Sequence, residues 1–454
     1  MKKICLALPT NRACTDTISA IGAEARYAAA YFDVEVHLLI LDSTDTPTFE
    51  AHTKALREAP HAPRVIVHHL DEAAQRDFLR RTIDRAAPAK PDLVLDLMLP
   101  TDVSYGACTN RIFLYAGALG CESVHRRDSD SDYQTIDGSP LFPIHHELAS
   151  LGKRAIDAVY GVCNIALDPA DAHRPVVMVG SSFIGELSVD IGEIYDLDHD
   201  AYHDIVSLWA PESWPHERKR ALVGESFRGA GTQPFTRDQS TLTVVDPMRI
   251  DMCNISFHRE VYERVPVLPA VNTIGSDYFL THLIHDAGLP GVVHNRNIVN
   301  FYTPERRTEA GFKAYHLRLA KFFLSMLYLN FIYERMADAG AKLLDDDGHV
   351  RPDAVIGFAR QSTELDRAEN VRRLEALDRS YRRLGGKYTD VADLLAAQRP
   401  RLLDEAQADI EDFALLTEVW PALVRASAAT TPTTPPTVRA AELPIPRPRH
   451  ADQS

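Results

Sequence analysis

Three aspartates alternate with serines in the stretch SVHRRDSDSDYQ, directly after two arginines. They are Asp128, Asp130 and Asp132, and the arginines are Arg126 and Arg127. Carboxylates two residues apart at the end of a strand can turn toward one ion. Mg²⁺ or Mn²⁺ held in this way keeps coordination positions open for phosphate oxygens, and a neighbouring arginine helps to balance the phosphate charge. The stretch is either a solvated acidic turn or a site for a divalent cation that binds a nucleotide diphosphate.

A calcium loop of the EF-hand type is excluded at this position. Such a loop has glycine at its sixth position and glutamate at its twelfth. Counted from Asp128, those positions are Tyr133 and Ser139.

Strand and helix patterns alternate along the first part of the chain, which predicts a mostly parallel sheet sandwiched by helices. In such sheets ligands bind beyond the carboxyl ends of the strands. The polar segments PTNR, LDSTDT and RRDSDSD all follow expected strands. Strands are expected at 3–8, 34–41 and 64–70, and helices at 15–32, 49–59, 71–87 and 105–119; 91–99 fits either.

The second half of the chain is more helical. Residues 306–428 are charged and predict a helical C-terminal region, and the Pro/Thr-rich residues 429–454 predict a disordered tail. The most apolar segment, 322–333, is twelve residues long, whereas a membrane span needs about 20. It predicts a buried or dimer-forming helix, so no integral membrane segment is expected and a homodimer is left open.

The overall charge limits the class of partner. The chain has 454 residues and a net charge of −15, with 49 Lys and Arg against 64 Asp and Glu. Nucleic acids and anionic membranes need clustered positive charge, so neither is expected as a partner. The six cysteines are scattered without a CxxC pair, which favours reduced thiols and a cytoplasmic location.

Five segments, in order along the chain, resemble the family-2-type glycosyltransferases with the GT-A fold. The resemblance covers about residues 3 to 305 and implies one nucleotide-sugar and acceptor domain over 1–305. The segments are ICLALPTNRACTDTISAIGAEA, LLILDSTDTPT, ACTNRIFLYAGALG, SVHRRDSDSD and IDMCNISFHREVYERVPVLPAVNTIGSDYFLTHLIHDAGLPGVV.

The resemblance implies roles for particular residues. Asp130 binds the metal directly, Asp128 binds the metal or ribose, and Asp277 is the catalytic base that takes the proton of the acceptor hydroxyl. His294 is the candidate third metal ligand. Arg306 and Arg307 either reach the diphosphate or are solvated. The remaining residues expected to bind the nucleotide sugar are Pro9, Asn11, Arg12, Asp42, Asn110 and Arg111.

Structural roles compete with several of these assignments. Asp42 can cap the following turn, Asp277 can be a helix N-cap, and Asn110 and Arg111 can pair with surface acids. The chain also departs from the family pattern, because a usually apolar strand carries His125, Arg126 and Arg127. Ser276 stands where many members have glutamate.

The sequence therefore predicts a Mg²⁺- or Mn²⁺-dependent glycosyltransferase that moves a sugar from a UDP- or GDP-sugar to a soluble small molecule. The resemblance favours inversion, and natural-product biosynthesis of the cyclitol or aminoglycoside type is the suggested context. One alternative is a sugar nucleotidyltransferase, although its phosphate loop is basic and rich in glycine, whereas PTNRACTD has one arginine and no glycine. The other is a non-catalytic binding protein of the same fold.

Overall fold

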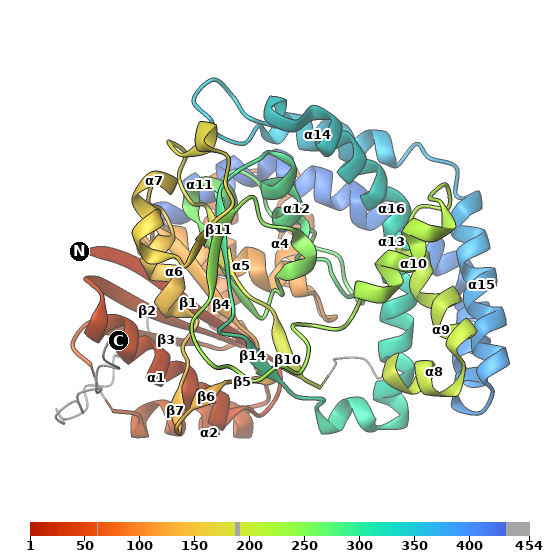
Figure 1. The fold of residues 1–454 in the computed structure, drawn as a ribbon, viewed down its shortest axis with the longest axis horizontal. Helices are drawn as coiled ribbons and strands as arrows, with labels where there is room; N and C mark the ends of the chain where they lie inside the picture. Colours follow the sequence, from red (N-terminus) through yellow and green to blue (C-terminus); the bar gives the residue numbers. More distant parts are fainter. Residues whose placement is uncertain (61, 187–190, 433–454) are drawn as a thin grey trace.

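A nine-stranded mixed sheet forms the centre of the computed structural model, which describes residues 1–60, 62–186 and 191–432 (Figure 1). The strand order is β3-β2-β1-β4-β12-β9-β13-β11-β8, and β10, β14 and β5 form a separate small sheet. Most of the tail predicted to be disordered, residues 433–454, lies outside the described residues. The strands are β1 Lys2–Thr10, β2 Val34–Asp42, β3 Val65–Leu70, β4 Ser123–Arg127, β5 Ser131–Tyr133, β6 Thr135–Ile136, β7 Ser139–Pro140, β8 Asn164–Ile165, β9 Met178–Gly180, β10 Phe183–Gly185, β11 Ser240–Thr243, β12 Asn254–His258, β13 Gly291–His294 and β14 Ile298–Asn300.

Strand direction changes at three places in the main sheet: between β4 and β12, between β12 and β9, and between β13 and β11. β1 is parallel to β2 and β4, and β2 is parallel to β3. β12 then runs antiparallel to both β4 and β9, while β9 and β13 are parallel. The predicted mostly parallel α/β sheet is confirmed, because β12, β11 and β8 run against the other strands of the main sheet, which share one direction. The antiparallel β12 next to β4 fits the expected GT-A fold.

Helices cover both faces of the parallel half of the sheet. Along β1, Ile4, Leu6 and Leu8 belong to the same apolar cluster as α1, whereas Cys5 and Ala7 face the cluster that contains α3 to α5. These residues face opposite sides of the sheet because successive side chains of a strand alternate between its two faces. The helices of the first half are α1 Thr15–Tyr31, α2 Thr46–Glu58, α3 Glu72–Ala86, α4 Pro91–Met98, α5 Tyr105–Leu119, α6 Ile144–Ser150, α7 Ala155–Ala158, α8 Ile191–Leu197, α9 His199–Val206 and α10 His216–Glu225.

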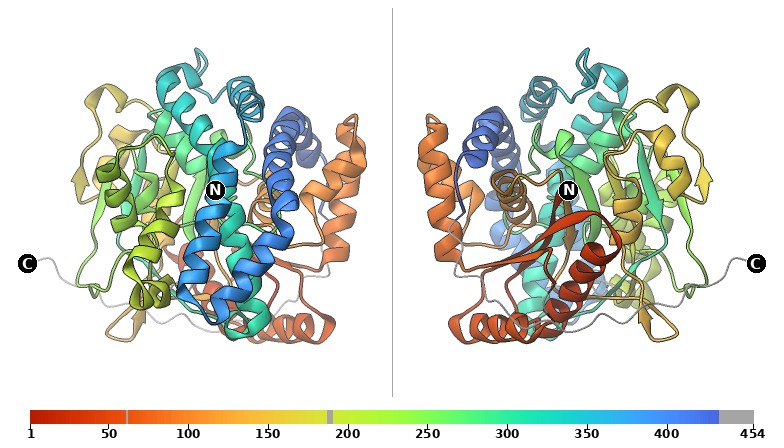
Figure 2. Two further views of the ribbon diagram at one scale, coloured as in Figure 1. Left: turned by 90° about the vertical axis from the view of Figure 1, so that its right-hand side faces the viewer. Right: turned by 90° about the vertical axis from the view of Figure 1, so that its left-hand side faces the viewer.

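Long helices make up the chain after residue 308, as the sequence predicts. They are preceded by α11 Arg259–Tyr262 and α12 Phe279–Asp286, and they are α13 Glu309–Ala339, α14 Pro352–Ser362, α15 Ala368–Leu384 and α16 Lys387–Ala428. α16 packs along α3 and α5 (Figure 2). Its Trp420 is fully buried and donates a hydrogen bond of 2.8 Å to the backbone oxygen of Tyr262.

The helical region and the sheet share one apolar core. Phe279 of α12 packs on Phe413 of α16 with ring centres 4.7 Å apart, and one core cluster extends from Cys5 to Leu423. The predicted boundary between residues 305 and 306 falls in the short helix Pro304–Arg307 and stays a prediction. The apolar segment 322–333 lies within α13 and is largely buried. Among the described residues, no helix is both long and apolar enough to cross a membrane.

The two arginines of β4 point to opposite faces of the sheet. Arg127 is fully buried and pairs with Glu24 of α1 at 2.8 Å and with Glu147 of α6 at 3.0 Å. Arg126 points the other way, toward Asp128 and Asp277. Burying a charge without a partner is costly. The charged strand can be buried because each of its arginines pairs with carboxylates.

Candidate active site

Loops at the carboxyl ends of β1, β2 and β4 surround a cleft of about 230 Å³, here called the sheet-edge cleft. The parallel register brings these ends together, with Thr10 opposite Asp42 and Ala7 opposite Arg126. The cleft is lined by residues 9–12, 41, 43, 72, 99–105, 108, 111, 126, 128–130 and 306. The polar segments that follow the strands thus meet at one edge, as the sequence predicts.

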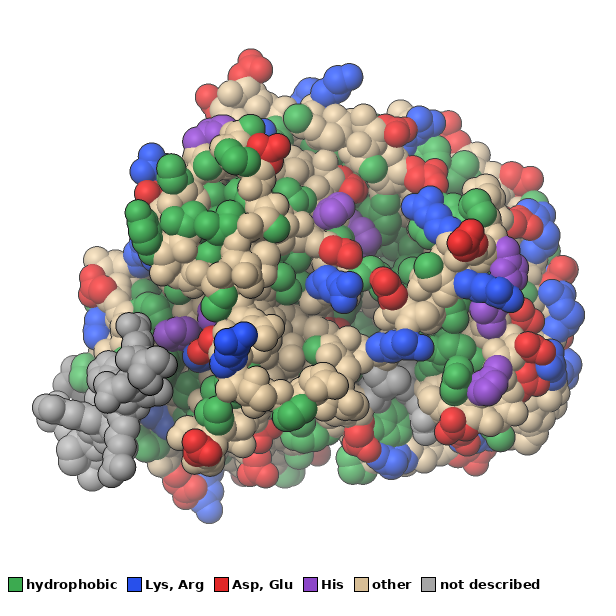
Figure 3. Space-filling view, in the orientation of Figure 1, with side chains coloured by type: hydrophobic (Ala, Val, Ile, Leu, Met, Phe, Trp, Pro, Cys, Tyr) green, Lys and Arg blue, Asp and Glu red, His purple; other side chains and the backbone are tan. Residues whose placement is uncertain are grey.

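A second cleft of about 230 Å³ adjoins the first and is here called the aromatic cleft. Its walls come from α12, α13 and the segments around residues 209, 227 and 250. A hollow is visible in the middle of the face shown in Figure 3, over the region where Figure 1 places α10, α12 and α13. The residues that line both clefts are Tyr105, Arg126, Asp128, Asp130 and Arg306.

Arg126 links the two predicted catalytic carboxylates. Its Nη2 lies 3.0 Å from Oδ1 of Asp128, and its Nη1 donates a hydrogen bond to Oδ2 of Asp277. Asp277 lies just before α12, whose N-cap is Tyr278 without a side-chain cap, so the competing N-cap role of Asp277 is not observed. Asp277 faces the aromatic cleft instead.

Asp130 is held by two arginines from distant segments. Arg12 Nη1, after β1, lies 3.0 Å from Oδ2 of Asp130, and Arg306 Nη2 lies 2.8 Å from the same oxygen. Arg306 Nη1 is buried and has no hydrogen-bond acceptor among the described residues. Since guanidinium groups bind phosphate, this unused donor at the meeting point of the clefts suits a phosphate oxygen.

Hydrogen bonds to the backbone oxygens of the turn hold the two aspartates in place. Thr17 Oγ1 of α1 donates to the carbonyl oxygens of Ser129 and Ser131, and Ser131 Oγ donates to the carbonyl oxygen of Asp128. The N–H of Phe301 donates to the carbonyl oxygen of Asp130 at 2.9 Å. The positions of the carboxylates are therefore set before any ligand binds.

The carboxylates crowd one another. Loss of hydration raises the pKa of Asp128 to about 6. The charge of Arg126 opposes this rise, and the charges of Asp130, Asp277 and Asp251 add to it. A bound cation relieves such crowding.

The donor set fits a hard divalent ion. Within the described part of the chain, no hydrogen bond is donated to Oδ2 of Asp128 or to Oδ1 of Asp130, because the arginines contact the other oxygen of each group. Carboxylate oxygens are what Mg²⁺ and Mn²⁺ prefer. Asp128 and Asp130 are therefore able to hold an ion without losing their arginines.

The structure brings most of the predicted residues together. Pro9, Asn11, Arg12 and Arg111 line the sheet-edge cleft, although Arg111 Nη1 already donates to the carbonyl oxygen of Met98 at 2.6 Å. Asn110 lines neither cleft. Its side-chain amide exchanges hydrogen bonds of 2.8 and 2.9 Å with the backbone of Val267, so it fastens α5 to that loop rather than facing a ligand.

Asp42 also lines neither cleft. Its Oδ2 contacts His52 Nδ1 at 2.7 Å and His69 Nε2 at 2.9 Å, and its Oδ1 accepts two hydrogen bonds from Thr44. Burial opposes ionisation, yet the bonds from His69, His52 and Thr44 lower the pKa of Asp42 to about 2. The carboxylate of Asp42 is therefore bonded to His52, His69 and Thr44 and does not face the cleft where the nucleotide was expected.

The Asp42–His52–His69 group has the composition of a metal site but not its proton arrangement. The N–H of Cys14 donates to Nε2 of His52 at 3.0 Å, so that nitrogen must be unprotonated. We assign the ring proton to Nδ1, the nitrogen that faces Asp42. This nitrogen is then a hydrogen-bond donor and not a ligand.

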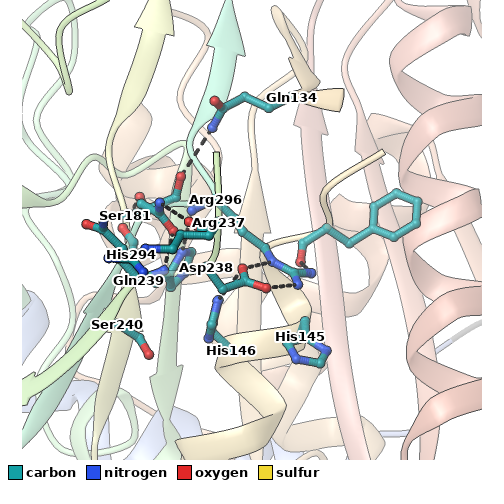
Figure 4. A network of polar contacts seen from close by, with 12 residues as sticks. Gln134, His145, His146, Ser181, Arg237, Asp238, Gln239, Ser240, His294 and Arg296 are labelled. Atoms are coloured by element: carbon teal, nitrogen blue, oxygen red, sulfur yellow. Dashed lines mark hydrogen bonds and ion pairs between the residues drawn. The ribbon is translucent and has the colours of Figure 1, made fainter. Parts of the chain in front are cut away.

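His294, the candidate third metal ligand, is not among the residues that line the two clefts. It lies at the end of β13, stacked on His146 with ring centres 5.1 Å apart. Figure 4 shows it in a network where Arg296 and His146 converge on Asp238. Burial lowers the pKa of His294 well below its usual value, so the ring is neutral. The structure therefore does not bring His294 to Asp128 and Asp130.

The sequence analysis did not single out several of the cleft residues. Tyr105 lies at the start of α5, Asp251 lies between β11 and β12, and Trp209 and Tyr315 come from helices that the sequence does not connect to the site. Their side chains meet only because α12 and α13 face the sheet edge. Single-sequence patterns report neighbours along an element and not this kind of long-range convergence.

Comparison with known proteins gives a family and a set of similar structures. Residues 2–436 match the model of DUF6271, a family of unknown function, and the chain belongs to that family. No curated protein matches. Among similar solved structures is a mannosyltransferase from Pyrobaculum calidifontis in complex with GDP-Man and Mn²⁺, with 13% identity, a TM-score of 0.34, and coverage of 91% of this chain and 86% of that one.

Another similar structure is glucosyl-3-phosphoglycerate synthase from Mycobacterium tuberculosis in complex with Mn²⁺, uridine diphosphate and glucosyl-3-phosphoglycerate. It has 15% identity and a TM-score of 0.34, over 72% of this chain and 80% of that one. Mouse xyloside xylosyltransferase 1 has 12% identity and a TM-score of 0.24, over 62% and 72% of the two chains.

Proposed function

We propose that this member of DUF6271 is a metal-dependent glycosyltransferase that moves a sugar from a UDP- or GDP-sugar to a small soluble acceptor. The observation that carries the proposal is that two adjoining clefts share Asp128 and Asp130. One cleft lies at the carboxyl edge of the parallel strands, where such sheets bind nucleotides. The other is open to a second molecule.

The arginines of the site suit a diphosphate. Arg12 and Arg306 both approach Asp130, and Arg306 keeps one buried N–H group without an acceptor. A diphosphate placed beside Asp130 gives these donors oxygen partners. Asp128 and Asp130 would hold Mg²⁺ or Mn²⁺, and the ion would neutralise charge on the diphosphate.

Asp277 is the proposed base. It lines the aromatic cleft, and Arg126 is bonded to only one of its oxygens. Its other oxygen accepts no hydrogen bond from the described residues, so it is free to accept the proton of an acceptor hydroxyl. Attack from the aromatic cleft on a sugar held at the sheet-edge cleft gives direct displacement with inversion.

Two features of biological setting belong to the proposal. The six cysteines are all free thiols, which suits the cytoplasm. Natural-product biosynthesis remains the proposed context, with a soluble acceptor.

Nucleotide binding tests the proposal directly. Melting temperature is measured with UDP, GDP and ADP, each with and without MnCl₂, for the wild type, Asp130→Asn and Asp132→Asn. Asp132 lies in the same acidic stretch but is exposed, so Asp132→Asn is a matched control. We expect UDP or GDP to raise the melting temperature only with Mn²⁺, in the wild type and the control but not in Asp130→Asn.

Other outcomes identify the alternatives. The same measurement is made with UTP and GTP, and stabilisation by either of them with release of pyrophosphate identifies a nucleotidyltransferase. Equal melting temperatures under all conditions identify a binding protein without nucleotide function. If transfer is observed, the anomeric configuration of the product, measured by NMR, distinguishes inversion from retention.

A further inference from the structure

The aromatic cleft has the walls of a site for an apolar ring. Trp209 contacts Phe227 and Phe322, with ring centres 5.5 and 5.2 Å apart. Other rings and three methionines complete the wall: Tyr278, Tyr315, Tyr333, Met248, Met252 and Met326. A ligand with an apolar surface binds favourably between such walls, because its apolar surface is removed from water. A ligand that is polar on every side has little binding free energy to gain there.

The charges of the same cleft are not balanced. Among the described residues, five carboxylates line it against three arginines, and two of the arginines, Arg126 and Arg306, are already paired with acids. The third, Arg228, is exposed at the rim, as is Glu225. Burial lowers the pKa of His282 to about 3, so this ring adds no positive charge. The cleft therefore has an excess of negative charge.

Asp251 accounts for the excess. It is half-buried and accepts hydrogen bonds from Tyr278 Oη at 2.7 Å and from the N–H of Cys253 at 3.0 Å. Within residues 1–60, 62–186 and 191–432, no Lys, Arg or His lies within ion-pair distance of it. The other three acids of the inner cleft each have an arginine.

From these two observations we infer that the acceptor is a small molecule with an apolar ring and a protonated amine. The amine pairs with Asp251 and is attracted by the aromatic faces, and the ring packs on Trp209 and Phe322. The inference rests on the proposed function, since it makes the aromatic cleft the acceptor site. It narrows the acceptor class, because a cyclitol without an apolar face does not match these walls.

Three probes separate the contributions of ring and charge. Tyramine has an aromatic ring and an amine, N-acetyltyramine has the same ring without the charge, and myo-inositol has neither. Their affinities are measured by calorimetry and ligand-observed NMR, without any nucleotide. We expect tyramine to bind about tenfold more tightly than N-acetyltyramine, and myo-inositol to bind more weakly than both.

Asp251→Asn is the test variant, because asparagine still accepts the N–H of Cys253 and keeps the turn. Asp246→Asn is the matched control: Asp246 is exposed, outside the cleft, and accepts the N–H of Met248 in a similar turn. We expect Asp251→Asn to bind tyramine and N-acetyltyramine equally and Asp246→Asn to keep the tenfold difference. The inference is overturned if N-acetyltyramine binds the wild type as tightly as tyramine, or if Asp251→Asn keeps the preference.

The two proposals fail separately. Selective binding of tyramine without Mn²⁺-dependent stabilisation by nucleotides supports the amine site and contradicts the transferase. Nucleotide stabilisation without a preference for tyramine supports the transferase and contradicts the amine-bearing acceptor.

Discussion

Arg126 of β4 donates a hydrogen bond to Asp277, a residue 151 positions later that lies just before α12. The same guanidinium reaches Asp128, so one buried cation holds a carboxylate of the metal motif and the proposed base at a fixed separation. Removing the cation leaves two crowded carboxylates without an opposite charge.

Arg126→Gln should therefore reduce stability. We expect the free energy of unfolding, measured by urea titration, to fall by about 3 kcal/mol, because breaking a buried ion pair leaves uncompensated charge. Arg249→Gln is the control, since Arg249 is exposed and has no ion pair among the described residues. Equal stability of Arg126→Gln and the wild type would show that the carboxylates do not need this partner.

Arg306 places a positive charge beside Asp130, and in the proposed site it supplies a donor for phosphate. Arg306→Gln should bind Mn²⁺ alone more tightly, by about threefold to tenfold, since one positive charge beside the carboxylate is lost. It should bind UDP in the presence of Mn²⁺ about tenfold more weakly. Both affinities are measured by calorimetry.

Arg307→Gln is the neighbouring control, because Arg307 is exposed and pairs with Glu186 instead. The opposite signs are the specific feature of this prediction. If Arg306→Gln loses affinity for both Mn²⁺ and UDP, the substitution has damaged the fold of the site. If neither affinity changes, Arg306 does not take part in binding either ligand.

The convergence at the sheet edge could be predicted from the sequence. Parallel strands joined by helices must end at the same edge, so PTNR and RRDSDSD had to meet whatever the details of packing. The short apolar run of β1 and the helical pattern of 306–428 were strong enough to place these elements. This is why Arg12, Asp128 and Asp130 were found together.

The partners of individual charges could not be predicted. Arg126 and Arg127 are adjacent in the sequence, yet one faces a cleft and the other pairs with Glu24, a residue on the apolar face of α1. Asp277 and Arg306 each depend on contacts across more than a hundred residues. Spacing along a chain carries information about one helix or strand, and ion pairs between elements depend on the packing of all of them.

Asp42 shows how a motif residue can be placed correctly and still have another role. It ends β2 beside the sheet-edge cleft, but His52 and His69, ten and 27 positions later, turn it inward. We expect Asp42→Asn to lower the free energy of unfolding by about 2 kcal/mol, because hydrogen bonds to a buried charge are lost. The affinity for UDP with Mn²⁺ should stay within about twofold of the wild type.

Asp45→Asn is the control for this change. Asp45 is exposed and caps α2 through the N–H of Thr48, a role that asparagine fills equally well. A large loss of UDP affinity in Asp42→Asn with unchanged stability would favour the nucleotide contact that the family resemblance implies.

Buried neutral histidines should make stability depend on pH. His316 of α13 is 1% exposed, contacts Tyr381 Oη at 3.0 Å, and has its pKa lowered to about 3 by burial and by Lys387. In the unfolded chain its pKa is about 6.5. Between these values the unfolded state binds the additional proton, so stability is complete above pH 6.5 and falls as the pH decreases toward 3.

Because of this one ring, the free energy of unfolding should be about 2 kcal/mol lower at pH 5 than at pH 7. His316→Gln removes the titrating group, so the difference in unfolding free energy between the two pH values should shrink by that amount. His173→Gln is the control, because His173 is exposed and its replacement should leave the pH dependence unchanged. The urea midpoint of the three proteins at pH 5, 6 and 7 measures the effect, and parallel curves for wild type and His316→Gln would contradict the assignment of a neutral buried ring.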